Sequence, residues 1–367
     1  MLGIAPIAAD AQSTRPINVV TTAVPFLRIN PDARGGGMGE TGIATDPDAN
    51  SAFWNLAKTP FNTSKSGIGL TYSPWLKKLG LNDVYLATLS GYTKLDDNQA
   101  ITASLRYFSM GDINFTDNMG NEFGAFKPRE FSVDAGYSRK LSDKLGMAMA
   151  LRYISSNLAG GKSVGGVTYK TGSTVAGDLS LFYNGKNSEG QGWSFGATLT
   201  NLGGKIGYTT DASQKDFIPA NLGLGAVYTK SFDEENKLSF AVDINKLLVP
   251  TPPAMGDSAG LVKYRSKGVT SSWLTSFGDA PGGFSEELRE YQISGGLEYV
   301  YDKQFAARIG YFHEDKTKGA RQYFTFGAGL MYNVFGINFS YIAPAGSGVD
   351  QNPLSNTMRF SLLLNLE

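Results

Sequence analysis

The sequence contains no cysteine and a single histidine, His313. Without cysteine the chain cannot form disulfides, thiolate nucleophiles, or zinc and iron–sulfur sites built on cysteine. One histidine excludes any multi-histidine metal site. Its acidic neighbours Glu314 and Asp315 favour a solvated residue at a strand end over a catalytic base. The sequence therefore predicts no enzyme: no catalytic residue, no metal site and no cofactor.

The sequence also lacks an excess of charge and a long apolar run. Its 33 basic side chains balance 33 acidic ones, and this neutrality argues against a nucleic-acid partner, which would require a basic surplus. No stretch of about 18 consecutive apolar residues is present, so the sequence encodes no transmembrane helix.

Glycine and aromatic residues are abundant instead. The 45 Gly, 18 Tyr and 22 Phe, with only 18% charged residues, are typical of a β protein. Fourteen segments alternate apolar and small or polar residues with period two, as strands do. They are Gly67–Ser73, Val84–Tyr92, Ile101–Tyr107, Phe131–Tyr137, Leu145–Tyr153, Val175–Tyr183, Trp193–Leu199, Leu222–Tyr228, Leu238–Ile244, Tyr291–Tyr299, Phe305–Tyr311, Phe324–Tyr332, Phe335–Tyr341 and Met358–Leu366.

The two faces of these segments differ in the way the wall of a membrane barrel requires. One face is uniformly apolar, with aromatics near the strand ends, and links between segments alternate between tight and long. We therefore predict an all-β, antiparallel transmembrane barrel of about 14 strands over 66–367, in an outer membrane with both termini periplasmic. The opposite face carries residues of both signs, which a wet lumen can hold and a packed core cannot. The predicted lumen-facing residues are Arg106, Asp134, Arg152, Asp178, Asp243, Glu298, Arg308 and Arg359.

The region before the first strand does not alternate. Residues 1–12 are typical of the end of a signal peptide, although an ordinary flexible terminus remains an alternative. Residues 13–65 contain Gly35–Gly37, which lack the Lys-Ser/Thr of a phosphate loop, and aromatic residues that require burial. We predict a plug (hatch) in the lumen, with Phe26 to Trp54 filling the periplasmic half of the barrel. Its key residues would be Asp32, Arg34, Gly35, Gly36, Met38, Gly39, Trp54 and Asn55.

Short motifs in this region resemble a known family. Asp32-Ala-Arg-Gly-Gly-Gly-Met-Gly39, then Ala44-Thr-Asp46 and Trp54-Asn-Leu-Ala57, resemble the N-terminal hatch of the FadL superfamily of outer-membrane barrels, with Leu56 where that family usually has Pro. Four further stretches resemble a narrower group, the PorV family of the type IX secretion system of Bacteroidota: Val19–Ile29, Asp243–Pro253, Ser276–Phe284 and Gly319–Gly329.

The resemblance implies a function and partners. PorV-like proteins bind the C-terminal signal domain of secreted cargo as it leaves the translocon barrel (SprA, or Sov), and carry it to the cell surface, in some species to a sortase complex containing PorU. The other surroundings implied are the lipid bilayer and lipopolysaccharide. The alternative is a FadL-type transporter of hydrophobic small molecules.

The longest link, Leu247–Glu287, is the predicted partner-binding loop. Its aromatic and apolar residues suit the anchors of a binding hot spot, or would pack within the loop as a lid. The candidate residues are Trp273, Leu274, Phe277, Asp279, Pro281 and Phe284.

Overall fold

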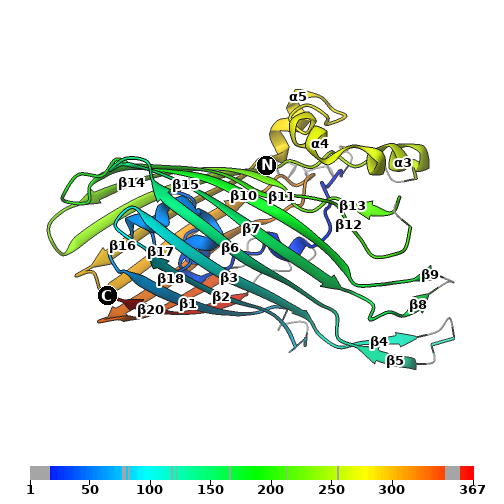
Figure 1. Ribbon diagram of the computed structural model, residues 1–367, viewed down its shortest axis with the longest axis horizontal. Helices are drawn as coiled ribbons and strands as arrows, with labels where there is room; N and C mark the ends of the chain where they lie inside the picture. Colours follow the sequence, from blue (N-terminus) through cyan, green and yellow to red (C-terminus); the bar gives the residue numbers. More distant parts are fainter. Residues whose placement is uncertain are drawn as a thin grey trace, which may run out of the picture.

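The computed structural model is a closed barrel of fourteen antiparallel strands (Figure 1). It describes residues 17–76, 80–81, 83–116, 119–120, 122–164, 167–211, 213–253, 256–343 and 356–367. The wall strands follow one another in chain order, and the last pairs with the first to close the barrel. They are β1 (Ser66–Pro74), β2 (Val84–Lys94), β3 (Gln99–Met110), β6 (Arg129–Lys140), β7 (Leu145–Asn157), β10 (Gly172–Asn184), β11 (Gly192–Gly203), β14 (Asn221–Ser231), β15 (Asn236–Leu247), β16 (Gln292–Tyr301), β17 (Phe305–His313), β18 (Gln322–Tyr332), β19 (Phe335–Ala343) and β20 (Met358–Leu366). The predicted fold class and strand number are confirmed.

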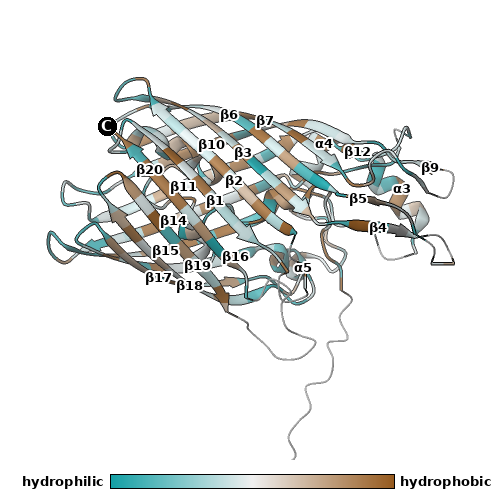
Figure 2. Ribbon diagram, turned by 90° about the horizontal axis from the view of Figure 1, so that it is seen from below, coloured by the Kyte–Doolittle hydropathy of each residue, from teal (hydrophilic) through white to brown (hydrophobic). Residues whose placement is uncertain are grey.

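Alternation along each strand produces an apolar outer surface and a polar inner one. Leu105 is exposed on the outside, whereas the next residue, Arg106, is buried inside. Met149 is 60% exposed and its neighbour Ala150 is buried. Figure 2 shows hydrophobic residues recurring along the wall strands. Closure leaves no strand edge unpaired, as a hydrocarbon environment demands.

The two ends of the barrel differ in the length of their connections. At one end, here called the short-turn end, strands are joined by links such as 302–304 and 333–334. At the other, the long-loop end, three two-stranded sheets and several helices project (Figure 1). The sheets are β4 (Ile113–Thr116) with β5 (Glu122–Phe126), β8 (Ser163–Val164) with β9 (Val167–Thr168), and β12 (Ile206–Gly207) with β13 (Lys215–Asp216).

The helices at the long-loop end all lie between β15 and β16. They are α3 (Ser258–Ser266), α4 (Val269–Thr275), α5 (Phe284–Glu287) and the 3-10 turn η4 (Leu288–Glu290). We call these four elements the helical rim. Among the described residues, no helix is long and apolar enough to cross a bilayer.

The segment before β1 runs through the barrel interior as the plug. Its elements are η1 (Pro25–Arg28), α1 (Ala33–Gly37), α2 (Ser51–Trp54) and η2 (Leu56–Phe61). Phe26 and Leu27 pack against Val84 and Phe108, close to the long-loop end. The end of η2 packs near the short-turn end, where the ring of Phe61 meets that of Phe182 edge-on at 5.4 Å.

This path differs from the prediction that Phe26 to Trp54 fill the periplasmic half of the barrel, because Phe26 lies close to the long-loop end, opposite the short turns predicted to be periplasmic. Because β1 starts at the short-turn end, the plug must finish there, and the preceding forty or so residues are long enough to span the lumen. Asn18 N donates to Thr317 O at the long-loop end, so the first described residues lie opposite the C-terminus. Residues 1–12, the predicted signal-peptide remnant, lie outside the described residues.

Candidate functional site: the plugged lumen and the helical rim

The turn of the plug around α1 is fixed by Asp32. Its Oδ1 accepts from Gly35 N at 2.7 Å, which caps the helix start, and its other oxygen accepts from the indole N–H of Trp54. Burial, with a smaller contribution from the Asp48 carboxylate, raises the pKa of Asp32. Asp32 therefore joins two parts of the plug that the sequence separates by more than twenty residues.

Arg34 ties the plug to the wall. Its Nη2 donates to Glu298 Oε1 at 2.7 Å and its Nη1 to Asp48 Oδ2 at 3.1 Å. Arg308 Nε donates to Glu298 Oε2 at 2.6 Å, so Glu298 is held between two guanidiniums. Burial alone would lower the pKa of Arg34, but Glu298 and Asp48 outweigh it and raise that pKa.

A second charged cluster lies within the wall. Arg152 donates through Nε to Asp134 and through Nη2 to Asp178 Oδ2 at 2.9 Å. Asn201 accepts from Arg152 Nη1, and its own backbone N donates to Asp178 Oδ1 at 2.7 Å. Asn201 has φ of 57° where the register between β10 and β11 shifts, and this bulge points its side chain inward.

The other three residues predicted to face the lumen, Arg106, Asp243 and Arg359, contact the plug. Arg106 Nη1 donates to Leu27 O at 2.8 Å, and its guanidinium lies over the ring of Phe53. Asp243 Oδ2 accepts from the backbone N of Gly42 and of Ile43.

Arg359 lies near the long-loop end of the interior, where its Nη2 pairs with Glu40 Oε1 at 3.3 Å. All eight residues predicted to face the lumen thus have buried or nearly buried side chains, and each has a polar partner inside the barrel.

Several interior residues were not predicted from the sequence. Lys58 is buried and donates from Nζ to Gly42 O at 2.7 Å and to Thr45 Oγ1 at 3.0 Å. Asp46 pairs with Lys186 and Lys237 at the short-turn end. Burial would raise the pKa of Asp46, but these lysines outweigh it and hold that pKa below its usual range. These charges lie in irregular or turn segments, where no periodicity marks the direction of a side chain.

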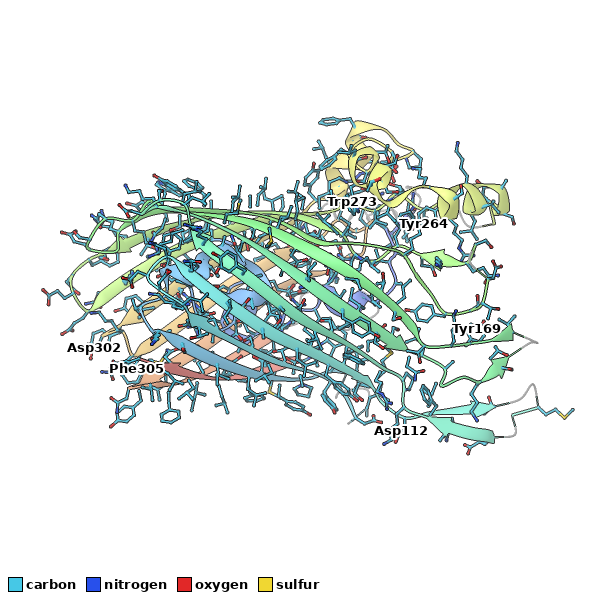
Figure 3. The ribbon with its side chains drawn as sticks, viewed as in Figure 1. Asp112, Tyr169, Tyr264, Trp273, Asp302 and Phe305 are labelled. Carbon is cyan, nitrogen blue, oxygen red and sulfur yellow. The ribbon has the colours of Figure 1, made fainter. Side chains whose placement is uncertain are left out.

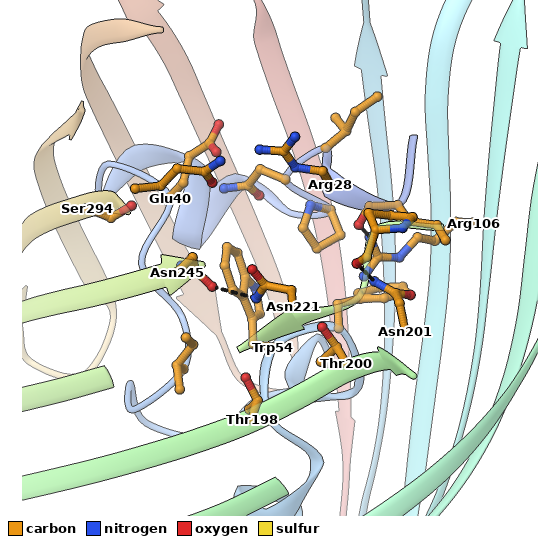
Figure 4. A pocket seen from close by; sticks show the side chains of 18 of the residues that line it. Arg28, Glu40, Trp54, Arg106, Thr198, Thr200, Asn201, Asn221, Asn245 and Ser294 are labelled. Carbon is orange, nitrogen blue, oxygen red and sulfur yellow. Dashed lines mark hydrogen bonds between the residues drawn. The ribbon is translucent and has the colours of Figure 1, made fainter. Parts of the chain in front are cut away.

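Two of the cavities beside the plug lie against η1 and the residues that follow it. The first, of about 120 Å³, has a mixed polar and apolar lining and lies between Trp54, Arg106 and the amide side chains of Asn201, Asn221 and Asn245 (Figure 4). The second, of about 360 Å³ and nearer the long-loop end, is largely apolar. Its lining residues are Pro25, Phe26, Ile29, Trp75 and Phe108, with Arg28, Asn30, Glu40, Gly319, Arg321 and Arg359.

The helical rim is attached to the barrel by buried ion pairs. Lys246, at the end of β15, pairs with Glu287 at 2.6 Å and Glu290 at 2.8 Å. Lys318, in the link between β17 and β18, pairs with Glu290 at 2.9 Å and with Glu286 at 2.7 Å. Glu290 is therefore shared by two lysines from different parts of the wall.

A further lysine caps the C-terminal end of α3. Lys205 Nζ donates to the carbonyls of Arg265 at 2.6 Å and Lys267 at 2.7 Å, which lack partners within the helix. Tyr264 of the same helix packs edge-on against Phe217 at 5.3 Å, and burial raises the pKa of Tyr264 to about 12. The rim is thus a docked helical layer and not an extended loop.

The predicted partner-binding residues fall into two groups within the rim. Leu274 is 79% exposed and Phe284 is 77% exposed, and Phe277 and Pro281 are exposed as well. Trp273 is half-buried; Figure 3 shows it in the helical rim, above the barrel wall.

Asp279 is half-buried and pairs with Lys267 at 3.1 Å, while its Oδ1 accepts from Thr251 Oγ1. Asp279 therefore joins parts of the rim and its base, whereas Leu274 and Phe284 present apolar surface to solvent. No group of three or more His, Cys, Asp or Glu that could hold a metal ion occurs in the part of the chain that the structure describes.

Comparisons with known proteins agree with this architecture. A family model described as "Type IX secretion system protein PorV" matches residues 11–254. No curated protein sequence matches the chain. Solved structures similar to this one include the toluene transporter TbuX of Ralstonia pickettii, with a TM-score of 0.54 and 12% identity over 92% of this chain and 98% of that one.

Two further solved structures are similar at the level of fold. The toluene transporter TodX of Pseudomonas putida has a TM-score of 0.53 and 12% identity, covering 92% of this chain and 98% of that one. A FadL homologue from Pseudomonas aeruginosa has a TM-score of 0.50 and 11% identity, covering 95% and 100%. Identities this low establish a common fold only.

Proposed function

The chain belongs to the PorV family of type IX secretion system proteins, and from this premise we propose that it receives secreted cargo at the outer surface of the outer membrane. The ligand would be the C-terminal signal domain of a cargo protein leaving the translocon barrel (SprA, or Sov). The barrel would then deliver the cargo at the surface, in some species to the sortase complex that contains PorU. No catalytic step is part of this proposal.

The exposed apolar side chains of the helical rim carry the proposal. Leu274, Phe277 and Phe284 are solvent-exposed on a layer that buried ion pairs hold in place. Rigidly held apolar anchors bind partners well because little conformational freedom is lost on association. The lumen is occupied by the plug, so the barrel interior offers no comparable surface.

The orientation in the membrane follows from this proposal. The long-loop end would face the outside, because the rim must meet cargo there. The short-turn end, with the C-terminus, would face the periplasm, as short turns do in barrels of this class. Protease added to intact cells should then cut the helical rim and leave the short turns uncut.

Binding of a purified cargo signal domain to the detergent-solubilised barrel tests the proposal. The variant Leu274→Ser with Phe284→Ser should weaken binding, since truncating a well-packed hot-spot residue costs about 2 kcal/mol or more. Two exposed apolar residues on the lipid-facing wall, Leu105→Ser with Leu362→Ser, form the matched control and should leave binding unchanged. Unaltered binding in the rim variant would contradict the proposal.

The apolar cavity supports a second candidate function, transport of a hydrophobic small molecule. Phe26, Trp75 and Phe108 line about 360 Å³ of space at the long-loop end. Transport would require that the plug open a path onward from this cavity. If transport is the function, Phe108→Arg should abolish uptake of a labelled hydrocarbon while surface delivery of secreted proteins is normal. Lost delivery with normal uptake in the variant Leu274→Ser with Phe284→Ser supports the secretion role.

A further inference from the structure

The inner wall of the barrel carries glycines where the plug comes closest. A methyl group at Gly327 of β18 would lie 3.0 Å from Gly37 Cα. One at Gly296 of β16 would lie 2.7 Å from Met38 Cβ, and one at Gly310 of β17 would meet the backbone of Met38 and Gly39. Real Cβ atoms essentially never come closer than 3.0 Å to other atoms, so β16 and β17 accept this turn of the plug only with glycine at these positions, and Gly327 of β18 lies at that limit.

The same relationship recurs farther along the plug. Ile43 lies against three glycines from β11 and β14, where added methyl groups would come within 2.6–2.7 Å of it. Leu56 and Ala57 lie in the same way against a glycine of β6 and one of β7. These wall glycines are Gly196, Gly223, Gly225, Gly136 and Gly146. The wall therefore follows the shape of the plug over most of its path.

Polar side chains of the wall also accept hydrogen bonds from backbone N–H groups of the plug. Thr325 Oγ1 accepts from Gly39 N at 2.8 Å, and Asp243 Oδ2 accepts from Gly42 N at 2.7 Å. Ser361 Oγ accepts from Ala33 N at 2.9 Å. If the plug left the lumen, these plug amides and the buried Asp243 would lose these partners, and Glu298 would keep Arg308 alone. A buried polar group without a partner costs about 1–3 kcal/mol, and a buried charge costs more.

We propose that the plug is a permanent part of the barrel and that it stays in the lumen while the protein works. It rests against the wall glycines named above, which we call the glycine track. The barrel interior is then a scaffold and not a conduit, and any ligand acts at the outer rim. The inference does not depend on which molecule binds there, and it opposes a transport cycle in which the plug moves aside.

Adjacent glycines of β16 provide a matched pair for testing the glycine track. A methyl group at Gly296 would meet Met38, whereas one at Gly295 would meet no atom within 4 Å. Gly296→Ala should speed hydrogen–deuterium exchange of the Gly39, Gly42 and Ile43 amides at least tenfold and raise single-channel conductance. Gly295→Ala should behave like the natural sequence, in which these amides exchange as slowly as the wall strands. Heat-modifiable migration on gels verifies that each variant still forms a barrel.

Rapid exchange of the plug amides in the unaltered protein would overturn the proposal, as would equal exchange in the two variants. Should Gly296→Ala fail to form a barrel, the exchange of the unaltered protein still decides between a seated and a mobile plug.

A covalent lock tests whether the plug must move in function. An added Cβ at Gly36 would lie 2.8 Å from Ser340 Oγ, within disulfide reach, and the chain has no other cysteine to interfere. In Gly36→Cys with Ser340→Cys, the oxidised barrel should bind cargo signal domain as well as the reduced one. Loss of binding on oxidation, restored by reductant, would overturn the proposal. Absence of binding in both states would reject the proposed function, while the exchange measurements still decide the fate of the plug.

Discussion

Arg34 of the plug and Glu298 of β16 form a two-point ion pair inside the barrel, with Nε donating to Oε2 at 2.9 Å and Nη2 to Oε1 at 2.7 Å. This geometry uses both oxygens of the carboxylate and two N–H groups on one edge of the guanidinium. Because Arg308 also donates to Glu298, the carboxylate balances one cation from the plug and one from the wall.

Removing the shared carboxylate should destabilise the protein more than removing one of its cations. Glu298→Gln removes the carboxylate that Arg308 contacts and leaves Arg34 with Asp48 alone, and breaking a buried pair costs about 3–5 kcal/mol. Arg34→Gln leaves Glu298 paired with Arg308 and should cost less. Denaturant unfolding in detergent micelles gives both values, and an equal or reversed order would contradict the shared role of Glu298.

The attachment of the helical rim should depend on Glu290. Glu290→Gln leaves Lys246 and Lys318 each with one fewer carboxylate, although both are almost fully buried. We expect the rim to undock and to be cleaved many times faster by trypsin, with unchanged thermal stability of the barrel. Glu286→Gln is the control, because Glu286 pairs with Lys318 alone. Equal cleavage of the two variants would show that Glu290 does not hold the rim.

The free-energy cost of placing a charge on the outer wall should depend on its depth in the bilayer. Met149 lies in the middle of β7 and is 60% exposed, so Met149→Arg should cost about 2–4 kcal/mol in a bilayer. Leu141→Arg, at the short-turn end, should cost only about 0–1 kcal/mol because the new charge lies near the interface. Folding titrations into lipid vesicles measure both. Similar values at the two positions would place the bilayer elsewhere on the barrel.

Lys58 should make the stability of the folded state rise with pH in the alkaline range. Burial lowers the pKa of Lys58 from 10.5 to about 8. Between these values the unfolded chain binds a proton that the folded protein has released, so stability increases as pH rises from about 8 to 10.5. Comparison of denaturation midpoints at pH 7.5 and pH 10 should show this increase, and Lys58→Met should reduce it. An identical pH dependence in both proteins would mean that Lys58 has an ordinary pKa.

The wall of the barrel could be predicted from the alternation of residues alone. Period-two alternation encodes a strand with two different faces, and the membrane makes that alternation strict because one face must be apolar throughout. For this reason the residues around Leu105 and Met149, and the sorting of short and long links, predicted strands, strand number and fold class. The PorV family was likewise predicted from short motifs and is confirmed by the family model over residues 11–254.

The path of the plug, its partners and the form of the rim depend on contacts between segments that are far apart in the chain. Glu298 lies 264 residues from Arg34 in the chain, and no local sequence pattern around either residue predicts the other as its partner. The inward turn of Asn201 arises from a bulge between two strands, and the docking of α5 from lysines in β15 and in the link after β17. Contacts of this kind depend on which surfaces the closed barrel brings together. Sequence periodicity describes one segment at a time, whereas the plug and the rim are held by several segments at once.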